Sequence, residues 1–141
     1  MYRTLITSPD QALVHLAFHC CLKDDTLQDE ELDLVAANII AKGINKTLNL
    51  KEEMQHYQSY YKSIKDELVY LDFLIDTINP KNKLALFAFC AEMVYRDNVI
   101  SLAEEVLLNK IASLLHVRDE ENIAVQKLVC ELNEVESRNA F

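Results

Sequence analysis

Carboxylates gather in one short stretch near the start of the chain. Six of them follow an apolar run within residues 24–33, namely Asp24, Asp25, Asp29, Glu30, Glu31 and Asp33. Carboxylate oxygens are the ligands that hard cations such as Ca²⁺ and Mg²⁺ prefer. Acids also stabilise a helix N-terminus, whose dipole favours negative charge. The stretch therefore predicts either a cation-binding turn or the solvated start of a helix. An EF-hand loop is excluded, because its twelfth position counted from Asp24 is Val35 and its sixth is not glycine.

A similar turn occurs later in the chain. Residues 12–35 and 85–108 align without a gap, as "ALVHLAFHCCLKDDTLQDEELDLV" over "ALFAFCAEMVYRDNVISLAEEVLL". Both copies contain, in order, an apolar helix, a base, an acid, a turn residue, an apolar residue, and a second acid seven positions after the first. The paired acids are Asp24 with Glu31 and Asp97 with Glu104. This shared order predicts an internal repeat.

The order resembles the TerB-like family, named for a tellurite-resistance protein. Its signature is an apolar helix ending in Asp-Gly, an aliphatic residue, and a Glu seven positions after the Asp. The resemblance implies a single helical domain over residues 1–141, a bundle of about seven helices with pseudo-twofold symmetry, and an acidic surface that binds a cation. On this interpretation Ca²⁺ or Mg²⁺ is held by Asp24, Glu31, Asp97 and Glu104. The family glycine is replaced here by Asp25 and Asn98, residue types that tolerate a left-handed turn only at some cost.

The acidic turns also fit a purely structural role. Ser101 and Glu104 have the spacing of a capping box, in which each side chain bonds to the other's backbone N–H. On that interpretation the acids cap helices and bind no metal.

Two histidines and four tyrosines are further candidates. His15 and His19 stand one helical turn apart and could hold a transition metal if a third ligand approached. The second copy has no histidine at either position, so we interpret them as an ordinary pair at the edge of a helix. Tyr57 and Tyr61 belong to an apolar seam and are expected in the core, with their hydroxyls at its rim. Tyr60 and Tyr70 lie off that seam, and we predict that they form a surface that binds a partner protein.

Composition indicates an all-α protein. The chain of 141 residues contains one glycine and two prolines, which leaves little turn chemistry for strands. Its net charge of −9 repels the phosphates of nucleic acids. The longest apolar run, "LALFAFCA", is too short to cross a bilayer. Unpaired spacing and apolar flanks predict buried, reduced thiols of a cytoplasmic protein for Cys20, Cys21, Cys90 and Cys130.

Capping signals and apolar periodicity predict seven helices, or six if the middle segment is continuous. The predicted ranges are 8–23, 29–42, 50–78 with a break near Ser63, 79–95, 101–116, and a last helix from residue 119. Ser8 with Gln11 is predicted to cap the first of these helices. Asn79 is predicted to cap the helix over residues 79–95, which is apolar nearly all round and is therefore expected to be buried. In the last helix, Ala124, Leu128 and Leu132 are predicted to face inward.

No phosphate-binding glycine loop, nucleophile elbow or metalloprotease helix occurs, so we expect a protein without catalytic activity. The leading hypothesis is a cytoplasmic TerB-like module that binds a divalent cation and acts in a stress-response or membrane-associated complex. The alternative is a protein-interaction or scaffold domain without a metal ligand.

Overall fold

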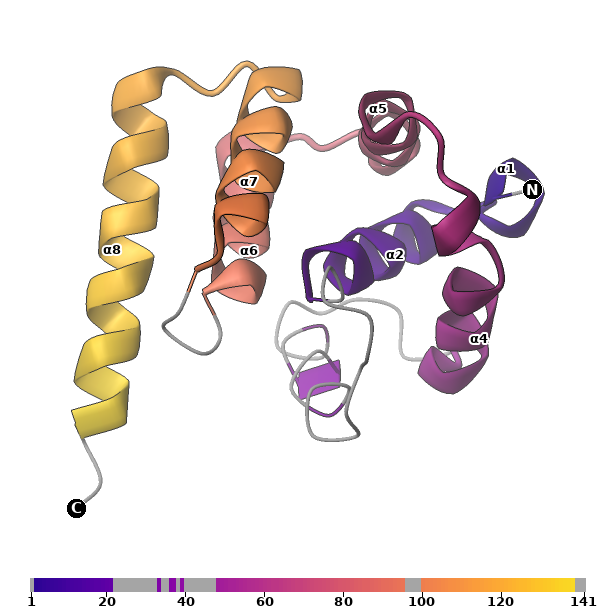
Figure 1. Cartoon of the computed structure of the whole chain (residues 1–141), viewed down its shortest axis with the longest axis horizontal. Helices are drawn as coiled ribbons and strands as arrows, with labels where there is room; N and C mark the ends of the chain where they lie inside the picture. Colours follow the sequence, from indigo (N-terminus) through magenta and orange to yellow (C-terminus); the bar gives the residue numbers. More distant parts are fainter. Residues whose placement is uncertain are drawn as a thin grey trace. The chain divides into compact units, whose positions relative to one another are not determined.

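The part of the chain that the structure describes is built from helices joined by short turns. The computed structural model describes residues 2–21, 33, 36–37, 39, 48–95 and 100–138, with side chains in the last range up to residue 135. These residues form seven α-helices and one short 3-10 helix and include no strand, which confirms the predicted all-α class (Figure 1). Within these ranges none of the helices has the length and hydropathy of a membrane span.

The chain divides into two compact units, Met1–Asn79 and Pro80–Phe141. The single domain over residues 1–141 stays a prediction. The internal repeat also stays a prediction, because residues 22–32 of its first copy lie outside the described part. Of the helix predicted over residues 29–42, only four positions are described, and all are helical: Asp33, Ala36, Ala37 and Ile39.

The first unit is built around one buried helix. It contains α1 (Tyr2–Leu5), α2 (Pro9–Cys21), α4 (Leu50–Tyr60), a 3-10 helix η1 (Tyr61–Ser63) and α5 (Glu67–Ile78), and α2 packs against both α4 and α5 (Figure 1). The start of α2 is capped as predicted, since the Ser8 hydroxyl accepts a hydrogen bond from the Gln11 N–H at 3.2 Å. The Gln11 side chain accepts one from the Thr7 N–H at 3.0 Å.

The predicted break in segment 50–78 is present, but a different residue restarts the helix. The N-cap of α5 is Asp66, whose carboxylate accepts hydrogen bonds from the N–H groups of Leu68 and Val69. Ser63 instead donates its hydroxyl to the carbonyl of Tyr60 at 2.6 Å. The apolar spacing over segment 50–78 predicts that Leu68 lies in the same seam as Tyr57, but Leu68 is exposed, because the break between α4 and α5 interrupts the helical period.

The second unit contains α6 (Lys83–Val94), α7 (Leu102–Leu114) and α8 (Asp119–Arg138), and α6 packs against both others. As predicted, α6 is buried nearly all round. The prediction of the residue that caps the N-terminus of α6 was wrong. Asn79 is the left-handed C-cap of α5, with φ 49° and ψ 62°, and Asn82 caps α6 through a 3.0 Å bond from the N–H of Ala85. Pro80 follows because it cannot continue a helix.

A Schellman motif ends α7. The N–H of Val117 donates to the carbonyl of Ala112 at 2.9 Å, and the N–H of His116 donates to the carbonyl of Ser113 at 3.2 Å. The motif needs a left-handed residue, which here is His116 with φ 56°. Glycine usually fills this position, so His116 holds a conformation that costs about 1 kcal/mol for a residue with a Cβ atom.

Candidate functional site

One of the four predicted metal ligands lies among the described residues. Asp24, Glu31 and Asp97 lie outside the described residues, whereas Glu104 is described and is 6 % exposed. Its carboxylate accepts the N–H of Ser101 at 3.1 Å, and the Ser101 hydroxyl accepts the N–H of Glu104 at 3.1 Å. This confirms the predicted capping box. No group of three or more side chains that could hold a metal occurs among the described residues, and the cation site stays a prediction.

The expectation that Tyr60 and Tyr70 lie on an exposed surface is wrong. Tyr60 is 1 % exposed and Tyr70 is fully buried. Their hydroxyl oxygens lie 2.6 Å apart, and the Tyr60 oxygen lies 2.6 Å from Nδ1 of His15. Buried hydroxyls need hydrogen-bond partners, and here two tyrosines and a histidine supply them to one another. These tyrosines therefore belong to the core of the first unit.

The tyrosine pair is the end of a hydrogen-bonded chain that runs across the first unit. Nε2 of His15 lies 2.9 Å from Oε1 of Glu53, a buried carboxylate on α4. The amide of Gln11 donates to the same carboxylate at 3.4 Å. The chain therefore runs from Glu53 through His15 and Tyr60 to Tyr70, and it joins α4, α2 and α5.

The carboxylate fixes the direction of every proton in this chain. An ionised Glu53 can only accept, so Nε2 of His15 carries a hydrogen and donates it. Nδ1 of the neutral ring is then an acceptor, and the Tyr60 hydroxyl donates to it. The Tyr60 oxygen in turn accepts the hydroxyl of Tyr70. In this hydrogen-bonded chain the Tyr60 hydroxyl therefore both donates and accepts, whereas the Tyr70 hydroxyl donates.

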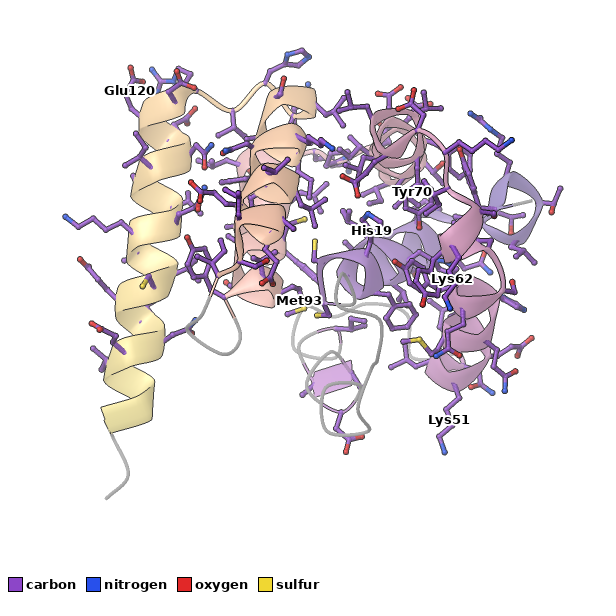
Figure 2. The ribbon with its side chains drawn as sticks, in the orientation of Figure 1. His19, Lys51, Lys62, Tyr70, Met93 and Glu120 are labelled. Carbon is purple, nitrogen blue, oxygen red and sulfur yellow. The ribbon has the colours of Figure 1, made fainter. Side chains whose placement is uncertain are left out.

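A second chain of the same type lies beside the first. Nε2 of His19 lies 2.9 Å from Oε2 of Glu67 on α5, and Nδ1 lies 2.8 Å from the Tyr57 hydroxyl. The ring centroids of His19 and Tyr70 are 5.2 Å apart with an angle of 61° between the ring planes, an edge-to-face contact, and both residues are labelled in Figure 2. We call the two chains the Glu–His–Tyr relays: Glu53–His15–Tyr60, extended by Tyr70, and Glu67–His19–Tyr57.

Helical spacing positions both relays. His15 and His19 are four residues apart on α2 and point to the same side. Glu53, Tyr57 and Tyr60 follow at i, i+4 and i+7 on α4 and form the facing row. The roles of Glu53 and Glu67 were missed from the sequence. The matched spacing on α2 and α4 was the available signal, but it does not reveal which two helices pack together.

Burial sets the protonation states within the relays. Loss of solvent lowers the pKa of His15 more than the neighbouring Glu53 carboxylate raises it, while the charge of His56 lowers it further. Burial raises the pKa of the hydroxyls of Tyr57, Tyr60 and Tyr70. At neutral pH the His15 ring is therefore neutral and these hydroxyls keep their protons.

The same contacts correct two expectations about position. His15 and His19 are buried rather than at an exposed helix edge, and the Tyr57 hydroxyl lies in the core rather than at its rim. Each ring nitrogen already faces a hydroxyl or a carboxylate at hydrogen-bond distance. Neither histidine has a lone pair left to bind a metal ion.

The last helix presents its aliphatic side chains to solvent. Ala124, Leu128 and Leu132 were predicted to face inward, and this prediction was wrong. Leu128 is 57 % exposed, Leu132 is 52 % exposed and Val135 is 55 % exposed. We call Ala124, Leu128, Leu132 and Val135, which lie on one side of α8, the outer stripe.

The opposite side of α8 packs against its unit mainly through amides. Asn122 donates to the side-chain oxygen of Asn109 at 3.2 Å, the Tyr95 hydroxyl donates to Gln126 at 2.8 Å, and Asn133 donates to the backbone carbonyl of Tyr95. Val129 is the buried aliphatic residue on this side. These hydrogen bonds fix the rotation of α8 and explain why its more hydrophobic side faces outward.

A polar hollow of about 550 Å³ lies at the turn between α7 and α8. Its lining includes Asn109, Ser113, His116, Arg118, Asp119 and Asn122. Arg118 is already paired with Glu121: Oε1 of Glu121 lies 3.1 Å from the backbone N of Arg118 and 3.1 Å from its Nε. These hydrogen bonds lower the pKa of the Glu121 carboxyl. The hollow therefore offers no concentrated charge to a ligand.

A scan against models of protein families, a search of curated proteins and a search of solved structures each found no match. The resemblance to the TerB-like family stays a prediction.

Proposed function

We propose that this protein is a non-catalytic helical module that binds a partner protein through the outer stripe of α8. The observation that carries the proposal is the inverted arrangement of α8, with amides inside and aliphatic side chains outside. A helix of a globular protein normally buries its aliphatic face. Removing apolar surface from water stabilises a complex by about 25 cal/mol per Å². Each exposed leucine that a partner covers therefore strengthens binding.

The Glu–His–Tyr relays support a structural rather than a catalytic role. An acid, an imidazole and a hydroxyl in series could in principle activate the hydroxyl as a nucleophile. Here Tyr57 and Tyr60 are each 1 % exposed, so a substrate would have to displace the core to reach them. The relays instead satisfy buried polar groups on α2, α4 and α5 and hold these helices in one register.

A cytoplasmic location is part of the same proposal. All four cysteines lie among the described residues, and none is in a disulfide. Three are buried, and Cys130 is half-buried. Reduced thiols of this kind are typical of proteins in a reducing compartment.

A photo-crosslinking experiment tests the proposed function. A photoreactive amino acid replaces Leu128 in the full chain, expressed in cells, and a matched control carries it at Leu102, which is 78 % exposed on α7. We expect a discrete crosslinked protein from position 128 only, and its loss when Leu132→Gln is added. Equal crosslinking from both positions, or none from position 128, would contradict a docking surface on α8.

A further inference from the structure

We infer that the partner segment which covers the outer stripe is a basic amphipathic helix, an inference that rests on the proposed function of the stripe. This inference is based on the charges beside the stripe. Between residues 119 and 135, α8 has the acids Asp119, Glu120, Glu121, Glu131 and Glu134, and its one base in that range is Lys127. The whole chain has a net charge of −9.

Three of these five acids lie beside or among the aliphatic residues of the stripe, whereas Asp119 and Glu134 lie farther round the helix. At 3.6 residues per turn, the four residues of the outer stripe fall within an arc of about 80° around the helix axis. Glu120 and Glu131 lie along one edge of this arc together with the base Lys127, and Glu121, which is paired with Arg118, lies within it. Glu120 and Glu131 are exposed, and Glu120 is labelled near the N-terminal end of α8 in Figure 2. A partner therefore meets an apolar band and negative charge together.

The length of the stripe fits a helical partner. From Ala124 to Val135 the stripe extends roughly 17 Å along α8, at 1.5 Å per residue. A partner helix can cover it with apolar residues at i, i+3, i+4 and i+7, which is the usual spacing of anchors in helix recognition. Lysine or arginine residues beside those anchors would face Glu120 and Glu131, and such complementary charges increase the association rate and set partner choice.

The same charges disfavour two other occupants. A second copy of this chain, docked stripe to stripe, would bring the acids of one α8 close to the acids of the other. An anionic membrane surface would repel a protein with this net charge, because such surfaces attract polybasic segments instead. A basic helix is the occupant for which burial and charge both favour binding.

Designed peptides test the inference on the full-length protein. Three helical peptides of about 18 residues, five turns, share one leucine seam and differ only in whether lysine, glutamine or glutamate flanks it. Binding is measured by isothermal titration calorimetry at low and at high salt. We expect the lysine peptide to bind about tenfold more tightly than the glutamine peptide at low salt, and the glutamate peptide to bind weakest. The difference in affinity between the three peptides should decrease at high salt, where charges are screened within a few ångströms.

Variants separate failure of this inference from failure of the proposed function. Leu128→Gln/Leu132→Gln should weaken every peptide at least about tenfold, while Leu102→Gln leaves binding unchanged. Glu120→Lys/Glu131→Lys should reverse the order of the lysine and glutamate peptides. Stripe-dependent binding without a charge preference overturns the basic partner and leaves the proposed function standing. Binding of no peptide, or binding insensitive to Leu128 and Leu132, overturns both. A dimer of the wild-type chain that Leu128→Gln/Leu132→Gln dissociates, seen by sedimentation equilibrium, replaces the basic helix with a second copy.

Discussion

Replacement of Tyr60 by phenylalanine should destabilise the protein far more than replacement of Tyr70. Both tyrosines are buried, their hydroxyls share one hydrogen bond of 2.6 Å, and phenylalanine fills almost the same volume. A count of lost hydrogen bonds already ranks Tyr60→Phe, which loses two, above Tyr70→Phe, which loses one. The direction of the protons in the first Glu–His–Tyr relay shows which groups each substitution leaves without a partner.

The magnitudes follow from which groups lose their partners. Tyr60→Phe leaves Nδ1 of His15 without a donor and the hydroxyl of Tyr70 without an acceptor, both in the core. Each orphaned buried group costs about 1–3 kcal/mol, so we expect a loss of about 2–4 kcal/mol once some relaxation is allowed. Tyr70→Phe removes the terminal donor only. Tyr60 still donates to His15, and the loss is that of one net hydrogen bond, about 0.5–1.5 kcal/mol.

Urea unfolding followed by far-UV circular dichroism at neutral pH measures the free energy of unfolding of the wild type and both variants. Tyr57→Phe in the second relay is the matched control. It removes the hydroxyl that bonds to Nδ1 of His19 and leaves that one ring nitrogen without its partner, so it should give an intermediate loss of about 1–3 kcal/mol. Equal losses for Tyr60→Phe and Tyr70→Phe, or a larger loss for Tyr70→Phe, would refute the proton directions derived for the relay.

Three further predictions concern pH, a turn and cation binding. Burial lowers the pKa of His15 in the folded protein, so as the pH falls below about 6.5 the unfolded chain binds a proton at His15 before the folded chain does. The free energy of unfolding should therefore have its full value above that pH and fall below it. The fall should be less steep in His15→Gln. His116→Gly should be about 1 kcal/mol more stable than His116→Ala in urea unfolding, because only glycine adopts the left-handed conformation without cost, and equal stabilities would contradict this. Calorimetric titration of metal-stripped protein with Ca²⁺ and then Mg²⁺ tests the predicted cation site: saturable heat lost in Asp24→Asn/Asp97→Asn would support it, and absence of heat would favour helix capping.

Local signals in the sequence predicted much of the fold. The caps at Ser8 and Ser101 were predictable because both partners of each cap lie within three or four residues of one another. The all-round apolar pattern of α6 likewise predicted a buried helix. Where two local signals competed, the prediction was wrong. Asn79 is followed by proline and resembles an N-cap, but the same asparagine also ends the preceding helix in a left-handed conformation.

The candidate sites depend on contacts between distant residues, which periodicity does not contain. Leu128 and Leu132 have the spacing of an inward stripe, but hydrogen bonds from Asn122 and Asn133 to residues of other segments rotate them outward. Tyr60 was similarly assigned to the surface because it departs from the apolar seam. Its hydroxyl is satisfied by His15, 45 residues away in sequence, and this partner permits its burial.

The first Glu–His–Tyr relay also constrains how this sequence can diverge. A single substitution at Glu53, His15 or Tyr60 leaves a polar group buried without its partner, so an isolated change is selected against even when the new residue fits the space. Joint replacement of the relay by apolar residues avoids that penalty. In any set of homologues we therefore expect these three positions to covary, with either the whole polar triplet or an apolar core in its place. Tyr70, the last residue of the hydrogen-bonded relay, should vary more independently of these three positions.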